Sequence, residues 1–167
     1  MIQAAIGLRV SAGLLTQVRA DLERRHPFAA ERIGFLKARQ AALPEGGALL
    51  LAFDYLVVPD EGYIRDRRVG ARIGDRGFRP ARQAAFSEAA SILHVHLHPH
   101  LGRPEPSSVD RRETAHFMPD FVNVAPAVAH GAVILSLDSL SGWAWRGSNV
   151  QLLSPITVVG APLVKVL

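Results

Sequence analysis

The chain has 167 residues, no cysteine and a formal net charge of +4, with 49% hydrophobic and 20% charged residues. This length predicts one domain over residues 1–167, and the composition is that of an ordinary globular protein. Without cysteine there can be no disulfide framework and no thiolate metal site. The segment MIQAAIGLRVSAGLL lacks the features of a signal peptide, and no apolar run reaches ~18 residues. We therefore expect a cytoplasmic protein without a membrane partner.

Arginine carries nearly all of the positive charge. The densest stretch, IRDRRVGARIGDRGFRPAR (residues 64–82), also contains Asp66 and Asp75. This mixture of signs predicts a solvated loop or hairpin, and a docking patch for an acidic partner is the alternative. Because the remaining arginines are scattered along the chain, we expect no nucleic-acid partner.

In the first half of the chain, the hydrophobic pattern predicts two helices and two strands. Residues 11–25 (SAGLLTQVRADLERR) have the apolar spacing of an amphipathic helix. Residues 31–39 (ERIGFLKAR) are typical of a short buried strand, and residues 47–60 of a core strand that ends at Pro59. Residues 81–92 (ARQAAFSEAASI) combine helix formers without a breaker and predict the second helix.

The second half of the chain is predicted to contain a helix between strands. Residues 92–98 (ILHVHLH) form a strand that Pro99 closes. Residues 107–120 begin as a helix, with Ser107 as the N-cap and Asp110 in the first turn. Further strands are predicted over residues 132–138 and 143–147, and one or two strands over residues 156–167. This alternation indicates an α/β protein in which helices pack on the faces of a mixed sheet.

The stretch HVHLHPH places His94, His96, His98 and His100 at alternate positions. Alternation is the period of a strand, so the four imidazoles should share one face of the backbone. A lone histidine in a strand is more often a hydrogen-bonded core residue than a ligand. Several buried imidazoles without partners would leave unsatisfied ring nitrogens, each costing ~1–3 kcal/mol. Because neutral imidazole is the commonest protein ligand of zinc, the stretch predicts a metal site.

Three separate motifs stand out: Glu31 in ERIGFL, HLHP at residues 96–99 and SSVD at residues 107–110. Together they resemble the signature of the JAMM (MPN-plus, JAB) zinc metalloprotease family. The stretch HGAVILSLDSLSGWAW is also similar to the strand pair that follows the motif in prokaryotic members, and the resemblance covers roughly residues 8–160. It implies an MPN/JAB domain with a three-layer α-β-α, cytidine-deaminase-like arrangement.

The resemblance also implies a role for each matched residue. His96, His98 and Asp110 would hold Zn²⁺, with water in the open fourth position. Glu31 would act as general acid/base, accepting a proton from that water and returning it to the leaving amine. Ser107 would hydrogen-bond the oxyanion of the tetrahedral intermediate.

The family cleaves peptide or isopeptide bonds after the C-terminal tail of ubiquitin or a ubiquitin-like protein. A free-standing domain of this length is similar to the prokaryotic, deubiquitinase-like branch. That branch implies a ubiquitin-like protein and its conjugates as substrates, and activating (E1-like) and conjugating (E2-like) enzymes as partners. The tail is expected to lie extended beside a strand near the zinc.

The choice of histidine pair depends on where the strand ends. Alternate residues lie ~6.6 Å apart, so two neighbouring histidines can converge on one ion, whereas three would span ~13 Å. Pro99 lacks an N–H and should place His98 last in the strand and His100 in the loop. His94 lies deeper, where we expect packing or hydrogen bonding. The loop before SSVD has eight residues, one more than the family usually has. The pairs His94 with His96 and His98 with His100 therefore stay open.

Other classes of protein could explain parts of the same pattern. One is a non-catalytic MPN scaffold or binding module, although such members typically lack the ligands. Another is a cupin-like metal site built from His98, His100 and Glu105, although its flanking glycines are absent and Pro104 and Pro106 suit a strand poorly. A His-x-His hydrolase of the barrel type would need ~200–250 residues or more.

Overall fold

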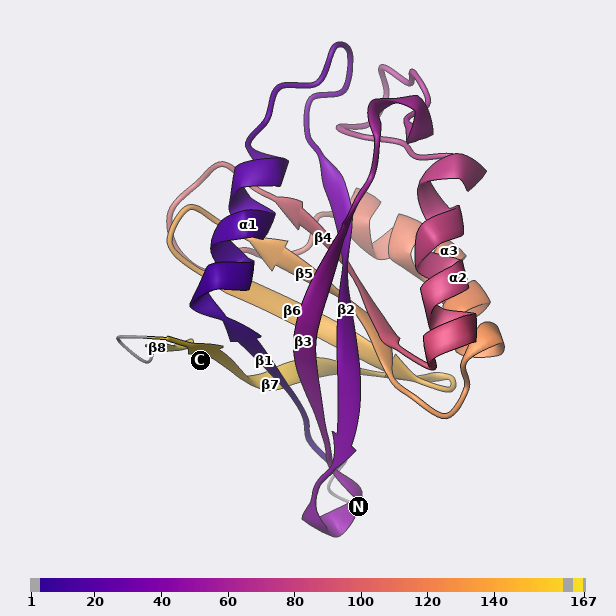
Figure 1. Cartoon of the computed structure of the whole chain (residues 1–167). Helices are drawn as coiled ribbons and strands as arrows, with labels where there is room; N and C mark the ends of the chain where they lie inside the picture. Colours follow the sequence, from indigo (N-terminus) through magenta and orange to yellow (C-terminus); the bar gives the residue numbers. More distant parts are fainter. Residues whose placement is uncertain (1–3, 161–163, 167) are drawn as a thin grey trace.

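The computed structural model describes residues 4–160 and 164–166, and within them the chain is a mixed α/β protein (Figure 1). Its α-helices are α1 (Ala12–Leu22), α2 (Asp75–Glu88) and α3 (Ser108–Val124), and the short 3₁₀ helices are η1 (Pro44–Gly46) and η2 (Asp60–Gly62). Its strands are β1 (Ile6–Ser11), β2 (Ile33–Ala42), β3 (Ala48–Val57), β4 (Ser91–Leu97), β5 (His130–Leu135), β6 (Leu140–Arg146), β7 (Asn149–Val159) and β8 (Val164–Val166).

Seven of the described strands close into a barrel. They follow the order β1-β3-β2-β4-β5-β6-β7, and β1 also pairs with β7, while β8 pairs with β7. The pairs β1–β3, β1–β7 and β4–β5 are parallel and the others antiparallel. The predicted mixed sheet is therefore confirmed, and its closure by β1 is an addition to that prediction. The three-layer arrangement implied by the family resemblance stays a prediction.

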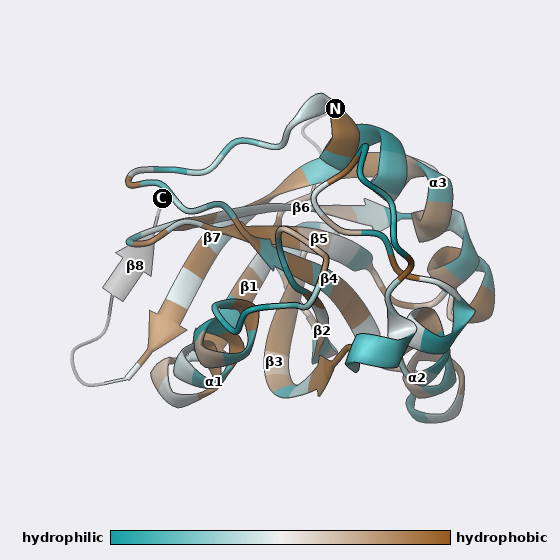
Figure 2. Ribbon diagram, turned by 90° about the horizontal axis from the view of Figure 1, so that it is seen from above, coloured by the Kyte–Doolittle hydropathy of each residue, from teal (hydrophilic) through white to brown (hydrophobic). Residues whose placement is uncertain are grey.

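The helices pack against two separate hydrophobic clusters. Val18 of α1 lies in the cluster that contains Leu93 and Val95 of β4. Ile92 of β4 lies in the other cluster, together with Phe121 of α3 and several alanines of α2. Because successive side chains of a strand face opposite sides, β4 is buried on both faces. Figure 2 shows α1 set apart from the α2–α3 pair.

Most of the predicted elements are confirmed, with shifted ends. The main difference is α2, which begins at Asp75 and contains Pro80, so that the arginine-rich segment ends in a helix instead of a loop. Because proline has no backbone N–H to donate, it breaks the helical hydrogen-bond pattern, and the predicted helix began only after Pro80, at residue 81. Strand β1 was not predicted. The one or two strands predicted over residues 156–167 overlap β7 and β8, and residues 161–163 and 167 lie outside the described part.

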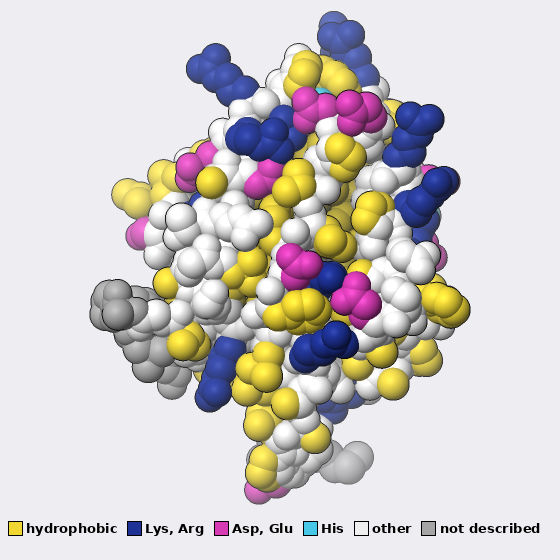
Figure 3. All heavy atoms as spheres, in the orientation of Figure 1, with side chains coloured by type: hydrophobic (Ala, Val, Ile, Leu, Met, Phe, Trp, Pro, Cys, Tyr) yellow, Lys and Arg dark blue, Asp and Glu magenta, His cyan; other side chains and the backbone are white. Residues whose placement is uncertain are grey.

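Strand β3 carries exposed apolar side chains. Leu51, Phe53 and Val57 are 38%, 44% and 44% exposed. Figure 3 shows hydrophobic side chains over β2 and β3, interrupted by charged groups of both signs. Across residues 4–160 and 164–166, no helix has the length and apolar character needed to cross a membrane.

Candidate metal centre

Strand β4 and the residues after it bring the four histidines into one row, as predicted. The ring centroids of His94 and His96 lie 5.4 Å apart, those of His96 and His98 4.9 Å, and those of His98 and His100 6.0 Å. Strand β4 ends one residue before His98, but the backbone N–H of His98 still donates to Leu135 O at 2.8 Å. His94 and His96 are buried, His98 is partly buried and His100 is exposed in the loop.

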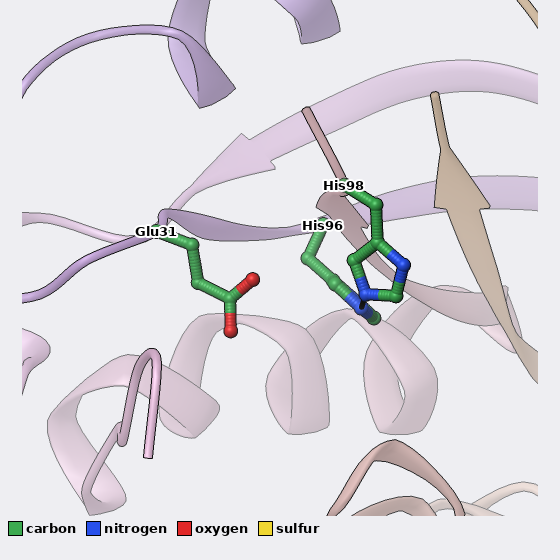
Figure 4. Close-up of side chains that lie close together, drawn as sticks. All are labelled: Glu31, His96 and His98. Carbon is green, nitrogen blue, oxygen red and sulfur yellow. Dashed lines mark hydrogen bonds between the residues drawn. The ribbon is translucent and has the colours of Figure 1, made fainter. Parts of the chain in front are cut away.

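The side chains of His96, His98 and Asp110 meet at the end of β4. The Nε2 atoms of His96 and His98 lie 3.1 Å apart. Oδ1 of Asp110 lies 3.3 Å from His96 Nε2, and Oδ2 of Asp110 lies 3.5 Å from His98 Nε2. Glu31 also borders the histidine pair, because one ligand atom each from Glu31, His96 and His98 lie within 4.8 Å of one another (Figure 4). These three residues form a partly buried group that could hold a metal ion.

The donor atoms suit such an ion. Two ring nitrogens that face each other at 3.1 Å need a proton or a cation between them. The opposite ring nitrogen of His96, Nδ1, is buried and has no hydrogen-bond partner within residues 4–160 and 164–166. Two imidazole nitrogens with a carboxylate oxygen make a donor set that Zn²⁺ accepts.

The start of α3 holds Asp110 in place. The side-chain oxygen of Ser107 accepts from Asp110 N at 3.1 Å, and Asp110 Oδ2 accepts from Ser107 N at 2.7 Å, which completes a capping box. Burial raises the pKa of Asp110, but hydrogen bonds from His96 and Ser107 outweigh it and hold the pKa below its usual range. The carboxylate is therefore ionised at neutral pH. The Ser107 hydroxyl acts as acceptor in the cap, so its own proton remains able to donate.

Glu31 lies in the segment directly before β2, and contacts on both sides hold that segment. Gly70 O accepts from Ala30 N at 2.8 Å and from Glu31 N at 3.3 Å. The neighbouring Arg32 is buried and forms an ion pair with Asp60 at 2.9 Å. The backbone around Glu31 is thus held on both sides, and the Glu31 side chain lies next to the histidines.

Burial sets the protonation of the groups around the pair. It raises the pKa of Glu31, as does the charge of Asp110, while His96 opposes the shift. A carboxyl group with a raised pKa is suited to exchanging protons near neutral pH. Burial also lowers the pKa of His98, and it lowers that of His94 to about 3. Both imidazoles are therefore neutral at pH 7, which is the form that binds metals.

A cavity of about 750 Å³ opens beside this centre. Glu31, His96 and Asp110 border it on the side of the candidate metal site. Its other walls come from the segment at residues 64–74, from α2 and from α3. We call this space the flanking cavity.

The sequence patterns did not identify the residues that form the other walls of this cavity. Gly70 touches Glu31 from a segment that was predicted to be a solvated loop or hairpin. Phe78 and Phe117 line the cavity from two different helices. The helical spacing of Phe117 and Phe121 could have indicated a buried face, but no local signal could show that it meets the metal centre.

The ligand set of a cupin-like site is not brought together among the described residues. Glu105 has an exposed side chain, 4.0 Å from Arg103. His100 Nδ1 lies 2.9 Å from the carbonyl oxygen of Leu101. The group that could hold a metal contains His98 but neither of these two residues.

No protein-family model matches the chain, and a search of curated proteins finds no related sequence. The resemblance carried by the three motifs therefore stays a prediction. The partly buried group of Glu31, His96 and His98 stands independently of it.

Proposed function

We propose that the chain is a zinc-dependent peptidase or isopeptidase of the JAMM type, with an MPN/JAB domain. It acts after the C-terminal tail of a ubiquitin-like protein. The observation that carries this proposal is the meeting of His96, His98 and Asp110 beside the partly buried carboxyl group of Glu31.

The proposal assigns Asp110 as the third ligand and Glu31 as the acid/base. Asp110 contacts both ring nitrogens, and its low pKa keeps it in the ligating form. Glu31 has the raised pKa that proton exchange requires. Two histidines and one carboxylate also suit Fe²⁺, so metal analysis of the purified protein is the first measurement. Zinc is favoured because hydrolysis needs an acid/base beside the ligands, and the partly buried carboxyl group of Glu31 lies there.

The chain's own groups supply the remaining chemistry. Zinc held by His96, His98 and Asp110 would supply the Lewis acidity that makes a water molecule nucleophilic near neutral pH. Glu31 accepts a proton from the attacking water and gives it to the leaving amine. The Ser107 hydroxyl donates to the carbonyl oxygen of the substrate as that oxygen gains negative charge.

The family resemblance implies both the substrate class and the E1-like and E2-like partners. The pairing of β4 limits where an extended tail can lie. Strand β4 pairs with β2 up to His96 and with β5 up to Leu97, so neither edge is open before the metal centre. A tail that adds to a strand must therefore run beyond the end of β4 or along the 64–74 segment.

The decisive experiment separates proton transfer from metal binding. Glu31→Gln keeps the size of the side chain but cannot accept a proton, so the variant should retain zinc and lose cleavage of ubiquitin-like fusion proteins. Glu23→Gln, an exposed glutamate directly after α1, is the matched control. Activity above a few per cent in Glu31→Gln, or loss of its zinc, would contradict the assignment.

The alternative is a non-catalytic MPN scaffold or binding module in a ubiquitin-like conjugation assembly. A scaffold has no need of converging ligands or of a glutamate with a raised pKa. It would bind ubiquitin-like proteins without cleaving them, and Glu31→Gln would not change that binding. Zinc-loaded protein that cleaves none of the ubiquitin-like fusion proteins tested would favour this alternative.

A further inference from the structure

The flanking cavity has an aromatic and aliphatic lining. The rings of Phe78 and Phe117 lie 5.1 Å apart, and the rings of His94 and Phe117 lie 5.2 Å apart. Ile64 and Ile73 add aliphatic surface, and Ile64 is 46% exposed. Aromatic rings at such spacings favour a further ring packed against them. The volume of about 750 Å³ falls within the range of pockets that bind organic groups.

Three buried polar atoms of lining residues, Arg82 Nε, His94 Nδ1 and His96 Nδ1, have no hydrogen-bond partner among the described residues. His94 lines the cavity and is 7% exposed, and its Nδ1 forms no hydrogen bond among the described residues. Leaving such an atom unpaired is unfavourable, so a bound group with a hydroxyl or N–H would be stabilised there. A phenol can serve either tautomer of the ring, because it both donates and accepts.

The charged residues around the cavity form ion pairs with one another. Asp66 contacts Arg68 and Arg72, and Arg82 bridges α2 to α3. The pairs and their distances are Asp66–Arg68 at 2.8 Å, Asp66–Arg72 at 3.1 Å, Arg82–Asp75 at 3.2 Å, Arg82–Asp120 at 2.9 Å and Arg112–Glu113 at 3.1 Å. Because these charges neutralise each other, the lining favours an uncharged side chain.

We propose that the flanking cavity is a specificity subsite that binds a bulky aromatic side chain of the substrate, one or two residues from the bond that is cleaved. This inference rests on the proposed function and adds a substrate preference to it. The short distance along the substrate follows because Glu31, His96 and Asp110 border both the cavity and the candidate metal centre. An extended peptide advances only ~3.3 Å per residue. A substrate with glycine at this position would leave the flanking cavity empty.

The test uses small metal-binding probes, so it does not need the natural substrate. Acetohydroxamate and 3-phenylpropionohydroxamate carry the same zinc-binding group, and only the second has a ring that can reach the cavity. Calorimetry on the zinc-loaded protein should show the phenyl probe binding roughly tenfold more tightly or better.

Two variants locate the ring, and a third serves as control. Phe117→Ala removes part of the lining, and Ala71→Trp fills the cavity from the 64–74 segment. In both, the ratio of the two affinities should fall to about one, with zinc content and circular dichroism unchanged. Phe86→Ala removes the same kind of ring from the exposed face of α2, outside the cavity, and should keep the wild-type ratio.

The outcomes separate this inference from the proposed function. Equal affinities of the two probes in the wild type, or a ratio unchanged in both cavity variants, would overturn the subsite while the metal site stands. A protein that neither holds zinc nor binds acetohydroxamate would overturn the proposed function and the subsite with it.

Discussion

The substitution Gly70→Ala tests whether the position of the Glu31 carboxylate matters. A Cβ atom added at Gly70 would lie 2.2 Å from Glu31 Oε1, whereas ordinary contact begins at 3.4 Å. The oxygen must therefore move by about 1.2 Å, the difference between these two distances. It belongs to the end of a flexible side chain, so the fold should lose little stability. A misplacement of this size costs ~10²-fold in rate when the group transfers a proton, and we expect kcat to fall by that factor.

The assay combines cleavage of a ubiquitin-like fusion with zinc content and thermal unfolding. The matched control is Gly13→Ala in α1, where an added Cβ meets nothing within 4 Å. It should leave the rate unchanged and stabilise the fold by up to about 1 kcal/mol. An unchanged rate in folded, zinc-loaded Gly70→Ala would refute the reasoning. Weaker zinc binding in that variant would instead make Glu31 a ligand.

Three further predictions concern the helix cap, the histidine pair and the arginine-rich segment. Ser107→Ala should cost ~1 kcal/mol of unfolding free energy through the lost cap. It should also lower kcat by ~10²-fold through the lost oxyanion donor. An unchanged kcat would confine Ser107 to capping. His96→Ala should abolish zinc binding and His100→Ala should not. If anomalous scattering at the zinc edge placed the metal next to His100 instead of His96, the pair of His96 and His98 would be excluded as ligands. Hydrogen bonds from Arg68 hold the pKa of Asp66 below its usual range. The stability that this ion pair adds to the fold is therefore present above the pKa of ~3.9 that Asp66 has in the unfolded chain, and it is lost as the pH falls through the lower pKa of Asp66 in the folded protein. Asp66→Asn should therefore flatten the acid side of the curve of Tm against pH, and an identical curve would show that the pair adds no stability.

Local sequence signals predicted the parts of the site that depend on neighbouring residues. The alternation of histidines placed the rings on one face because strand geometry alone decides that. Pro99 marked the end of β4 to within one residue. The spacing of Ser107 and Asp110 predicted the helix cap that the structure contains. Each of these features is determined within a few residues of chain.

The features that were not predicted depend on residues far apart in the sequence. Gly70 meets Glu31 across 39 positions, and nothing near either residue indicates the contact. The flanking cavity needs the 64–74 segment, α2 and α3 to come together. Because of Pro80, the first turns of α2 were not predicted to be helical, and this wall of the cavity was predicted to be a loop or hairpin. Closure of the sheet likewise joins opposite ends of the chain.

The pairing of β1 with β7 has a consequence for how the chain acquires its structure. Strand β1 can pair with β3 as soon as residue 57 has been made, but its other edge has no partner until residues 153–159 exist. Such a long-range contact is slow to form because a large loop must close first. During synthesis, the open edge of β1 is a surface on which another chain could add. We therefore expect truncation before residue 153 to give aggregated protein, although every residue of the candidate metal centre would still be present.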